Sequence, residues 1–404
     1  MIKSLISRIF QSRHFWRDAT FSEIAELYAS RTLRLAAINI GAGFTSVYML
    51  RSGYSLAFIM SFWALLYFTK SFIAPLAGIL VSRIGPAKGT FFSNLLYIPA
   101  MMALGFMPEF KIISIIIFAV CMGISVTLYE VCYFIEFSIV KNPEHAGKEI
   151  GFMNILEKIA ISLSPVIGGA IALIFGAPTT MWVASLLFAL AALPLLRNSS
   201  KSEKQQKITI RGFPWRMALP SIMAKTATGF DLVASSIVWG LFLTIYVFPK
   251  SGNNIYVILG ALSSVTVVVA ILTSIWYGKT IDKNKGGNLL KVGVVANSIV
   301  HVSRIFITSP FDALGVNIVN EAATTAQNMA FLRGMFDTAD VSGHRIMYLV
   351  AVDMMNNIGA TIACVAMILC TTMLTGPSSF KVFFGIAAFA ILFVSTARFP
   401  IYRK

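Results

Sequence analysis

Apolar stretches long enough to cross a lipid bilayer recur from residue 33 to residue 398 of this 404-residue chain. Hydrophobic residues make up 57% of the sequence and charged residues only 12%, and the mean hydropathy is +0.78, so one water-soluble core cannot bury them all. The runs lack the strict polar–apolar alternation that a membrane β-barrel requires. The chain is therefore predicted to be an all-α membrane protein.

Twelve membrane-spanning helices are expected from these stretches. Their ranges are about 33–50, 54–81, 90–107, 112–138, 150–176, 181–196, 217–248, 254–277, 290–309, 312–336, 345–374 and 380–398. The predicted domains are a basic amphipathic segment on the inner leaflet (1–30), an N-terminal six-helix bundle (31–196), a polar linker (197–216), a C-terminal six-helix bundle (217–398) and a tail (399–404).

Positive charge is distributed unevenly between the predicted spans. The net charge of +16 would suggest a nucleic-acid partner if it were clustered on a soluble domain. Instead, 25 of the 33 lysines and arginines fall in segments on one side, among them Arg31 and Arg34, against four on the other side and four within spans. The positive-inside rule then places both termini in the cytoplasm, with the chain in the plasma (inner) membrane. No nucleic-acid partner is expected.

Two sequence segments recur across the linker. Residues 78–88, between spans 2 and 3, match residues 278–286, between spans 8 and 9, at an offset of 200. Residues 147–157, entering span 5, match residues 343–353, entering span 11, at an offset of 196. Two repeats at nearly equal offsets predict duplicated six-helix halves.

The repeated loop resembles the signature of the major facilitator superfamily, which has the form G-x-L-a-D-R-x-G-r-r/k. The first copy matches it at Gly78, Arg83, Gly85 and Lys88, and the second at Gly278, Asp282 and Lys283. Ser82 replaces the family's aspartate in the first copy, so the first copy lacks the carboxylate that would make a latch there. The resemblance implies two pseudo-symmetric six-helix bundles around a central cavity and transport by alternating access.

Span 5 carries a second resemblance to that family. Its sequence Ser164-Pro165-Val-Ile-Gly168-Gly169 is similar to the G-P-x-x-G-G element of the family's antiporters. Proline and paired glycines permit a bend and close helix contact. The element favours export by antiport, although kinks of this kind also occur in membrane helices generally.

Three carboxylates fall within predicted spans, where an ionised group costs about 2.5 to 3.5 kcal/mol on insertion scales. They are Glu130 in span 4, Asp231 in span 7 and Glu321 in span 10. Polar residues on spans 7 and 10 accompany them: Lys225, Asn317, Asn320 and Gln327. Because spans 1, 4, 7 and 10 line the cavity in the resembled family, we expect these residues to face a solute or to exchange protons. The alternative is that they bond one another in a static bundle.

Other charges within the spans suggest pairs. Glu157 and Lys158 are adjacent in span 5, and Lys158 is expected to neutralise Glu130 because both lie at a similar depth. Lys70 in span 2 and Asp353 in span 11 lie at similar inner depth, on helices that meet in the resembled fold. We predict an interdomain pair that breaks when the inner side opens. Arg304, with His301 one turn before it, is expected to be structural.

Enzyme chemistry finds no support in the sequence, which has no nucleophile elbow, no metal-ligand spacing and no phosphate-binding loop. The predicted function is secondary active transport of a small solute, coupled to protons, with export favoured. Uptake of a small metabolite by symport and a transport-dead membrane sensor or assembly protein are the alternatives. The expected partners are membrane lipid, a small-molecule substrate and protons, with no cofactor and a monomeric chain.

Overall fold

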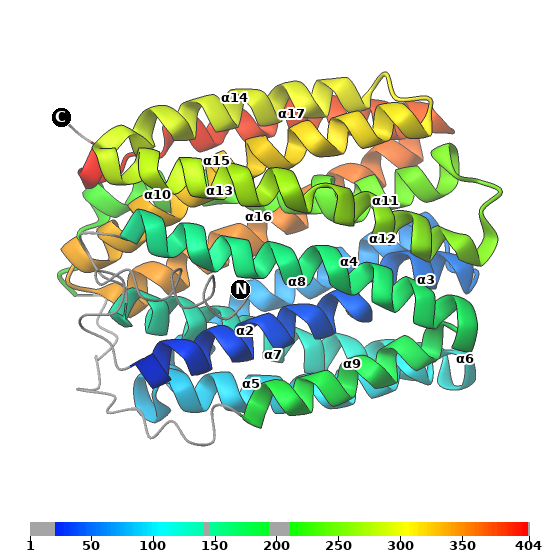
Figure 1. The fold of residues 1–404 in the computed structure, drawn as a ribbon, viewed down its shortest axis with the longest axis horizontal. Helices are drawn as coiled ribbons and strands as arrows, with labels where there is room; N and C mark the ends of the chain where they lie inside the picture. The colour runs from blue at the N-terminus through cyan, green and yellow to red at the C-terminus, as the bar shows by residue number, and fades with distance from the viewer. Residues whose placement is uncertain (1–20, 141–145, 194–210, 403–404) are drawn as a thin grey trace, which may run out of the picture.

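The computed structural model describes residues 21–140, 146–193 and 211–402, and every regular element within those ranges is helical. The long helices run side by side along the longest axis of the molecule (Figure 1). Most of the expected amphipathic segment and of the linker lie outside the described residues. We call residues 21–193 the first half and residues 211–402 the second half.

The helices of the first half follow one another through short connections. They are α2 (Phe21–Ile40), α3 (Thr45–Arg51), α4 (Leu56–Ile84), α5 (Pro86–Gly105), α6 (Met107–Phe110), α7 (Ile112–Val140), α8 (Ala146–Phe175) and α9 (Ala177–Ala192). Between α4 and α5 only Gly85 intervenes, at φ +85°, a conformation that favours glycine, and Pro86 then starts α5 with its φ already suited to a helix.

The second half contains several interrupted helices. Its elements are α10 (Trp215–Leu232), α11 (Trp239–Phe242), α12 (Ile255–Val265), α13 (Val267–Thr280), α14 (Gly286–Arg304), α15 (Pro310–Val341), α16 (Arg345–Met373) and α17 (Pro377–Leu392). A π-helical stretch, Val233–Val238, joins α10 to α11, and another, Leu243–Val247, follows α11. Such widened turns are frequent at functional sites. Short 3₁₀ turns at Phe393–Thr396 and Pro400–Tyr402 follow α17.

Eight helical stretches of the described chain are long and apolar enough to cross a membrane. Large apolar side chains also face outward, as at Leu65, Phe72 and Leu76 of α4, each more than half exposed. An outward apolar surface of this kind is stable in lipid and not in water. The chain is thus built as a multi-pass integral membrane protein.

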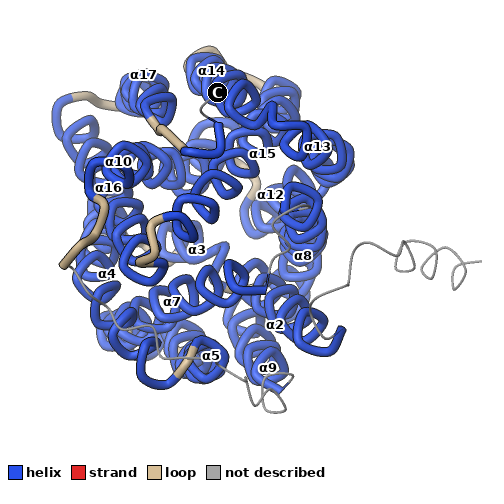
Figure 2. Tube along the Cα trace, turned by 90° about the vertical axis from the view of Figure 1, so that its left-hand side faces the viewer, coloured by secondary structure: helices blue, strands red, loops and turns tan. Residues whose placement is uncertain are grey.

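The two halves meet along two long seams. Helix α4 packs against α16 on one side, and α8 packs against α12 and α13 on the other. Viewed along the helix axes, α4 and α16 lie on the opposite side of the molecule from α8, α12 and α13, and the remaining helices of each half lie between these two groups (Figure 2). Within the halves, α5 packs on α7 and α9, and α14 packs on α15 and α17.

The start of the first membrane helix differs from the sequence expectation. Helix α2 begins at Phe21, and an apolar stretch from Tyr28 to Arg51 is long enough to span the membrane. Arg31 and Arg34, which were counted with the inner segments, therefore lie inside this helix and not in a connecting segment. Arg34 is only 1% exposed. A count of charges in each segment assumes that every arginine near a span lies in water, whereas the Arg34 side chain is buried among helices.

Candidate functional site

Four ionisable side chains come together where the two halves meet. Lys70 of α4 and Glu130 of α7 belong to the first half, and Lys225 of α10 and Asp353 of α16 to the second. Both lysines interact electrostatically with both carboxyl groups. Lys70 and Asp353 are buried. We call these four residues the interface cluster.

The carboxyl groups of Glu130 and Asp353 approach each other across the halves. An ionised carboxylate only accepts hydrogen bonds, so the two groups can bond each other directly only when one of them carries a proton. Asn357 Nδ2 donates a further hydrogen bond of 3.1 Å to Asp353 Oδ2. With one such proton, Glu130 and Asp353 would together carry one negative charge.

The two lysines of the interface cluster are not held in direct ion pairs. Within the described chain, no nitrogen–oxygen distance of 4.0 Å or less joins either lysine to a carboxyl group. The Nζ atom of Lys70 lies 5.3 Å from the ring centre of Tyr67, and that of Lys225 lies 5.1 Å from the ring centre of Phe331. The predicted pair of Lys70 and Asp353 is therefore present as proximity across the halves and not as a contact ion pair.

A direct salt bridge between the halves joins α8 to α15. Lys158 Nζ lies 2.8 Å from Glu321 Oε1, and both side chains are mostly buried, at 21% and 12% exposed. The expectation that Lys158 neutralises Glu130 was wrong, because equal depth does not decide which neighbour a side chain faces. The preceding residue, Glu157, binds Arg31 of α2 at 2.9 Å. Adjacent residues of α8 thus connect it to one helix of each half.

Asp231 belongs to a buried network within the second half. Its Oδ1 atom accepts a hydrogen bond of 2.9 Å from Ser235 and lies 2.8 Å from Nε2 of His301, while Oδ2 accepts 3.0 Å from Asn297. Arg304 NH1 donates to Ser235 at 3.1 Å and lies 3.1 Å from Nδ1 of His301. Because Ser235 lies in a π-helical turn, the widened backbone sets its hydroxyl between the carboxylate and the guanidinium.

The hydrogen bonds of this network fix the charge of His301. A guanidinium only donates, so Nδ1 must accept from Arg304 and the single ring proton lies on Nε2, where it is donated to Asp231. His301 is therefore neutral, and Asp231 and Arg304 balance each other. The structural role expected for Arg304 agrees with this geometry.

The polar stripe of α15 also bonds within the second half. Asn320 Oδ1 accepts from Arg304 at 3.1 Å, Gln327 Oε1 accepts from Asn297 at 3.2 Å, and Asn317 Oδ1 accepts from Trp239 at 2.9 Å. These hydrogen bonds satisfy polar side chains of the stripe, so its polarity does not require a bound solute. Asp231, unlike Glu130, has no partner across the halves among the contacts of the described chain.

A second buried cation, Arg34, was missed as a site residue. It donates 2.7 Å to Asn94 and 3.3 Å to Ser125, and its guanidinium lies 3.9 Å from the ring centre of Tyr129. Arg31 lies over Tyr133 in the same way, at 4.4 Å. The available signal was the pair of tyrosines at helical spacing in α7, which offers two ring faces to cations.

The repeated loop motif lies at the same end of the molecule in both halves. Arg83 and Lys88 are exposed on either side of Gly85, and Lys283 is exposed beside Asp282. Gly78 and Gly278 are buried inside α4 and α13. The second copy makes its turn with Asn284 at φ +59°, where the first uses Gly85. Asparagine tolerates a positive φ better than most residues, so both loops turn at a residue suited to this conformation, a glycine in the first and an asparagine in the second.

The glycines of the span 5 element lie at helix crossings. A Cβ on Gly168 would lie 2.9 Å from the backbone Cα of Ile40 in α2. A Cβ on Gly169 would lie 2.9 Å from a carbonyl oxygen of α12, and one on Gly260 of α12 would lie 2.7 Å from the carbonyl oxygen of Pro165. The element therefore permits the closest backbone approach between the halves along the α8 seam.

Contacts join the halves at both ends of the helices. At one end, the rings of Phe137 and Phe336 lie 5.1 Å apart and Ser138 donates 3.3 Å to Asp340, joining the last turns of α7 and α15. At the other end, the ring of Phe44 meets that of Tyr256, at the start of α12, at 5.3 Å. Opening either end requires breaking a different set of contacts.

Charged side chains from both halves meet inside this bundle of membrane helices, and charges within membrane helices commonly mark the paths of transported solutes or ions. The family model of the Major Facilitator Superfamily matches residues 27–336, so this chain belongs to that superfamily. Its members are transporters and not enzymes. A search of curated proteins gave no match.

Solved structures of superfamily transporters share the fold. The chain is similar to the human organic anion transporter MFSD10, with a TM-score of 0.69, 10% identity and coverage of 93% of this chain and 100% of the other. A bacterial homologue of the iron transporter ferroportin in an outward-facing state has a TM-score of 0.70 at 12% identity, covering 93% and 98%. The fucose:proton symporter of E. coli has a TM-score of 0.65 at 13% identity, covering 94% and 99%. At these identities the likeness is one of fold.

Proposed function

We propose that this protein is a secondary active transporter that moves a small solute by alternating access, coupled to protons. The observation that carries the proposal is the interface cluster: two carboxyl groups from different halves approach each other beside two lysines, at the place where the halves must separate for a solute to pass. In the proposed cycle the two carboxyl groups hold one proton between them while the halves are in contact. The second carboxylate of this pair becomes charged only when the halves separate, so proton binding is linked to the conformation of the protein.

The proposal also assigns the helices to twelve membrane spans in two bundles. Helices α2 with α3, α4, α5, α7, α8 and α9 form six spans, and α10 with α11, α12 with α13, α14, α15, α16 and α17 form six more. The two seams then separate two bundles, with the solute cavity between them near the interface cluster. Both termini lie in the cytoplasm and the chain works as a monomer. The exposed basic loops Arg83–Lys88 and Lys283–Lys285 support this orientation.

Proton transfer follows from the surroundings of Glu130 and Asp353. While the halves are in contact, the shared proton leaves one negative charge beside two lysines. When the halves separate, water reaches both carboxyl groups and the proton can leave. Lys70 and Lys225 then balance two carboxylates, so the deprotonated cluster is neutral. Proton release thus favours separation, and proton uptake favours closure.

The salt bridge of Lys158 and Glu321 supports the same cycle by a different contact. It holds α8 to α15 while the halves are closed, and each partner becomes free to face a solute when they open. Pro165, Gly168 and Gly169 allow α8 to approach and leave α12. Because this element resembles that of the family's antiporters, we propose that transport runs as export in exchange for protons.

The test begins with a screen for solutes that raise the melting temperature of the purified protein. Proteoliposomes loaded with a pH-sensitive dye then report whether each stabilising solute drives proton movement. We expect coupled proton flux in the wild type, loss of coupling in Glu130→Gln/Asp353→Asn, and retained coupling in the exposed control Glu109→Gln. Coupled flux that persists unchanged in the double variant contradicts the assignment of the proton site.

A further inference from the structure

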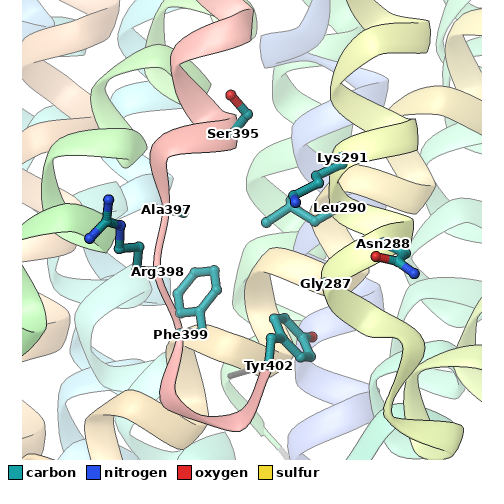
Figure 3. A pocket seen from close by; sticks show the side chains of 9 residues that line it. All are labelled: Gly287, Asn288, Leu290, Lys291, Ser395, Ala397, Arg398, Phe399 and Tyr402. Atoms are coloured by element: carbon teal, nitrogen blue, oxygen red, sulfur yellow. The ribbon is translucent and has the colours of Figure 1, made fainter. Parts of the chain in front are cut away.

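A pocket of about 640 Å³ lies where α14 begins and the chain emerges from α17. Its polar lining comprises Asn288 and Lys291 of α14 with Ser395, Arg398 and Tyr402 from the segment after α17. Figure 3 shows Lys291 extending from α14 into the space between the helix and that segment. The pocket adjoins the second basic loop, because α14 begins at Gly286, directly after Lys283 and Lys285.

The C-terminal segment is anchored, so this pocket has fixed walls. Phe399 is buried and its ring meets that of Phe331 edge to face at 5.1 Å. Tyr402 donates a hydrogen bond of 2.8 Å to the carbonyl of Ala330, and a Cβ on Gly287 would lie only 3.2 Å from the Tyr402 side chain. The glycine at the start of α14 thus admits the ring that forms the floor of the pocket.

The lining of the pocket carries two cations, Lys291 and Arg398, and its residue Tyr402 also lies near Arg333 and Asp337. Lys291 and Arg398 are exposed, and within the described chain no carboxyl oxygen lies within 4.0 Å of either. A second pocket, of about 500 Å³, lies on the other side of Arg398 and adds Arg216. The three cations Lys291, Arg398 and Arg216 suit a phosphate group.

An apolar surface continues directly from the pocket along the lipid-facing side. Val292, Val295 and Ile299 of α14 are 65%, 52% and 59% exposed and recur at helical spacing. Phe389 of α17 and Phe393 just beyond it are 77% and 66% exposed. Because α14 packs on α17, these side chains border one strip. A free phosphate would leave this strip unused, whereas the acyl chains of a phospholipid would cover it.

We propose that this pocket binds the headgroup of an anionic phospholipid, with the phosphate held by Lys291 and Arg398 and the acyl chains lying along α14 and α17. Bound lipid would tie the start of α14 to the end of α17 across the C-terminal segment. Basic pockets at membrane-helix ends recognise anionic headgroups in this way. The inference is independent of the proposed transport cycle.

Binding is tested on the full-length protein in neutral detergent. The probes are dioleoylphosphatidylglycerol, dioleoylphosphatidylcholine and inorganic phosphate, with bound lipid counted by native mass spectrometry and stability followed by melting temperature. We expect retention and stabilisation by phosphatidylglycerol only. In Lys291→Gln/Arg398→Gln the apparent affinity should fall about fivefold for each cation removed. The charge-conserving Lys291→Arg/Arg398→Lys should retain most of it.

The matched control is Lys250→Gln/Lys381→Gln, which removes two exposed cations from the opposite end of the helices. It should bind phosphatidylglycerol as the wild type does. Equal retention by the pocket variant and the control would overturn the proposal, as would equal stabilisation by phosphatidylcholine. Stabilisation by inorganic phosphate as large as that by phosphatidylglycerol would show that the pocket binds a soluble anion, and would overturn the proposal of a phospholipid ligand. A pocket variant whose melting temperature without lipid equals that of the wild type shows that its loss of binding is not a loss of fold.

Discussion

Breaking the salt bridge between Lys158 and Glu321 should shift the conformational equilibrium of the protein. The charged atoms lie 2.8 Å apart, and the side chains are 21% and 12% exposed. Removing one partner of a fully buried pair costs about 3 to 5 kcal/mol, and an exposed pair contributes about 0.2 to 1 kcal/mol. For a mostly buried pair we take about 2 kcal/mol. Since the bridge joins the halves, this energy favours their closed arrangement by about thirtyfold.

The assay measures distances between spin labels at the exposed positions Arg83 and Lys283, one in each half, in nanodiscs and on a cysteine-free background. Lys158→Gln should enlarge the population with long distances. The charge-swapped Lys158→Glu/Glu321→Lys should restore the wild-type distribution more closely than either single reversal, because the pair energy is a coupling between the two positions. Unchanged populations in Lys158→Gln, or a swap that behaves as the sum of its single reversals, refutes the reasoning.

Two further substitutions test the packing and the buried network. Gly169→Ala would set a Cβ 2.9 Å from an α12 carbonyl oxygen, so we expect the protein to lose about 1 to 3 kcal/mol of stability and to melt at a lower temperature. The control Gly385→Ala in α17, where a Cβ would meet nothing within 4 Å, should change the stability little. Equal effects of the two substitutions would contradict the close approach of α8 and α12. Asp231→Asn leaves Arg304 buried without its balancing charge, which should cost about 3 to 5 kcal/mol of stability, and Asp231→Asn/Arg304→Met should recover part of it. No recovery in the double variant would show that the two charges do not compensate each other.

Hydropathy alone predicted the helical membrane architecture, because lipid forces long apolar helices whatever their tertiary partners. The loop at Gly85 was also recognised from the sequence, because its residues resemble the family's loop signature. The sequence further pointed to charged residues within the spans, because a buried charge is costly and stands out.

The partners of those charges were not readable from the sequence. Depth along a helix can be estimated from residue number, but the direction a side chain faces depends on packing, so Lys158 was paired with Glu130 when it binds Glu321. The contact of Glu130 with Asp353 escaped prediction for another reason. Reasoning from the sequence pairs groups of opposite charge. Two carboxyl groups come together stably only when one of them is protonated, and a sequence does not show protonation states.

The buried arginines illustrate a third limit. Arg34 is satisfied by the side-chain oxygens of Asn94 and Ser125 and by the face of Tyr129, none of which carries a formal charge. A search for compensating carboxylates therefore overlooks it. His301 was visible one turn before Arg304, but its neutral state follows only from which ring nitrogen each neighbour contacts.

The most direct test of proton-coupled alternating access follows both ends of the molecule at once while the pH changes. Spin-label distances would be measured between positions 83 and 283 at one end and between positions 109 and 250 at the other, all exposed. The account predicts that one distance lengthens as the other shortens on passing from acid to alkaline pH, and that Glu130→Gln/Asp353→Asn abolishes this dependence. Two distances that stay constant, that lengthen together, or that keep their pH response in the double variant would contradict it.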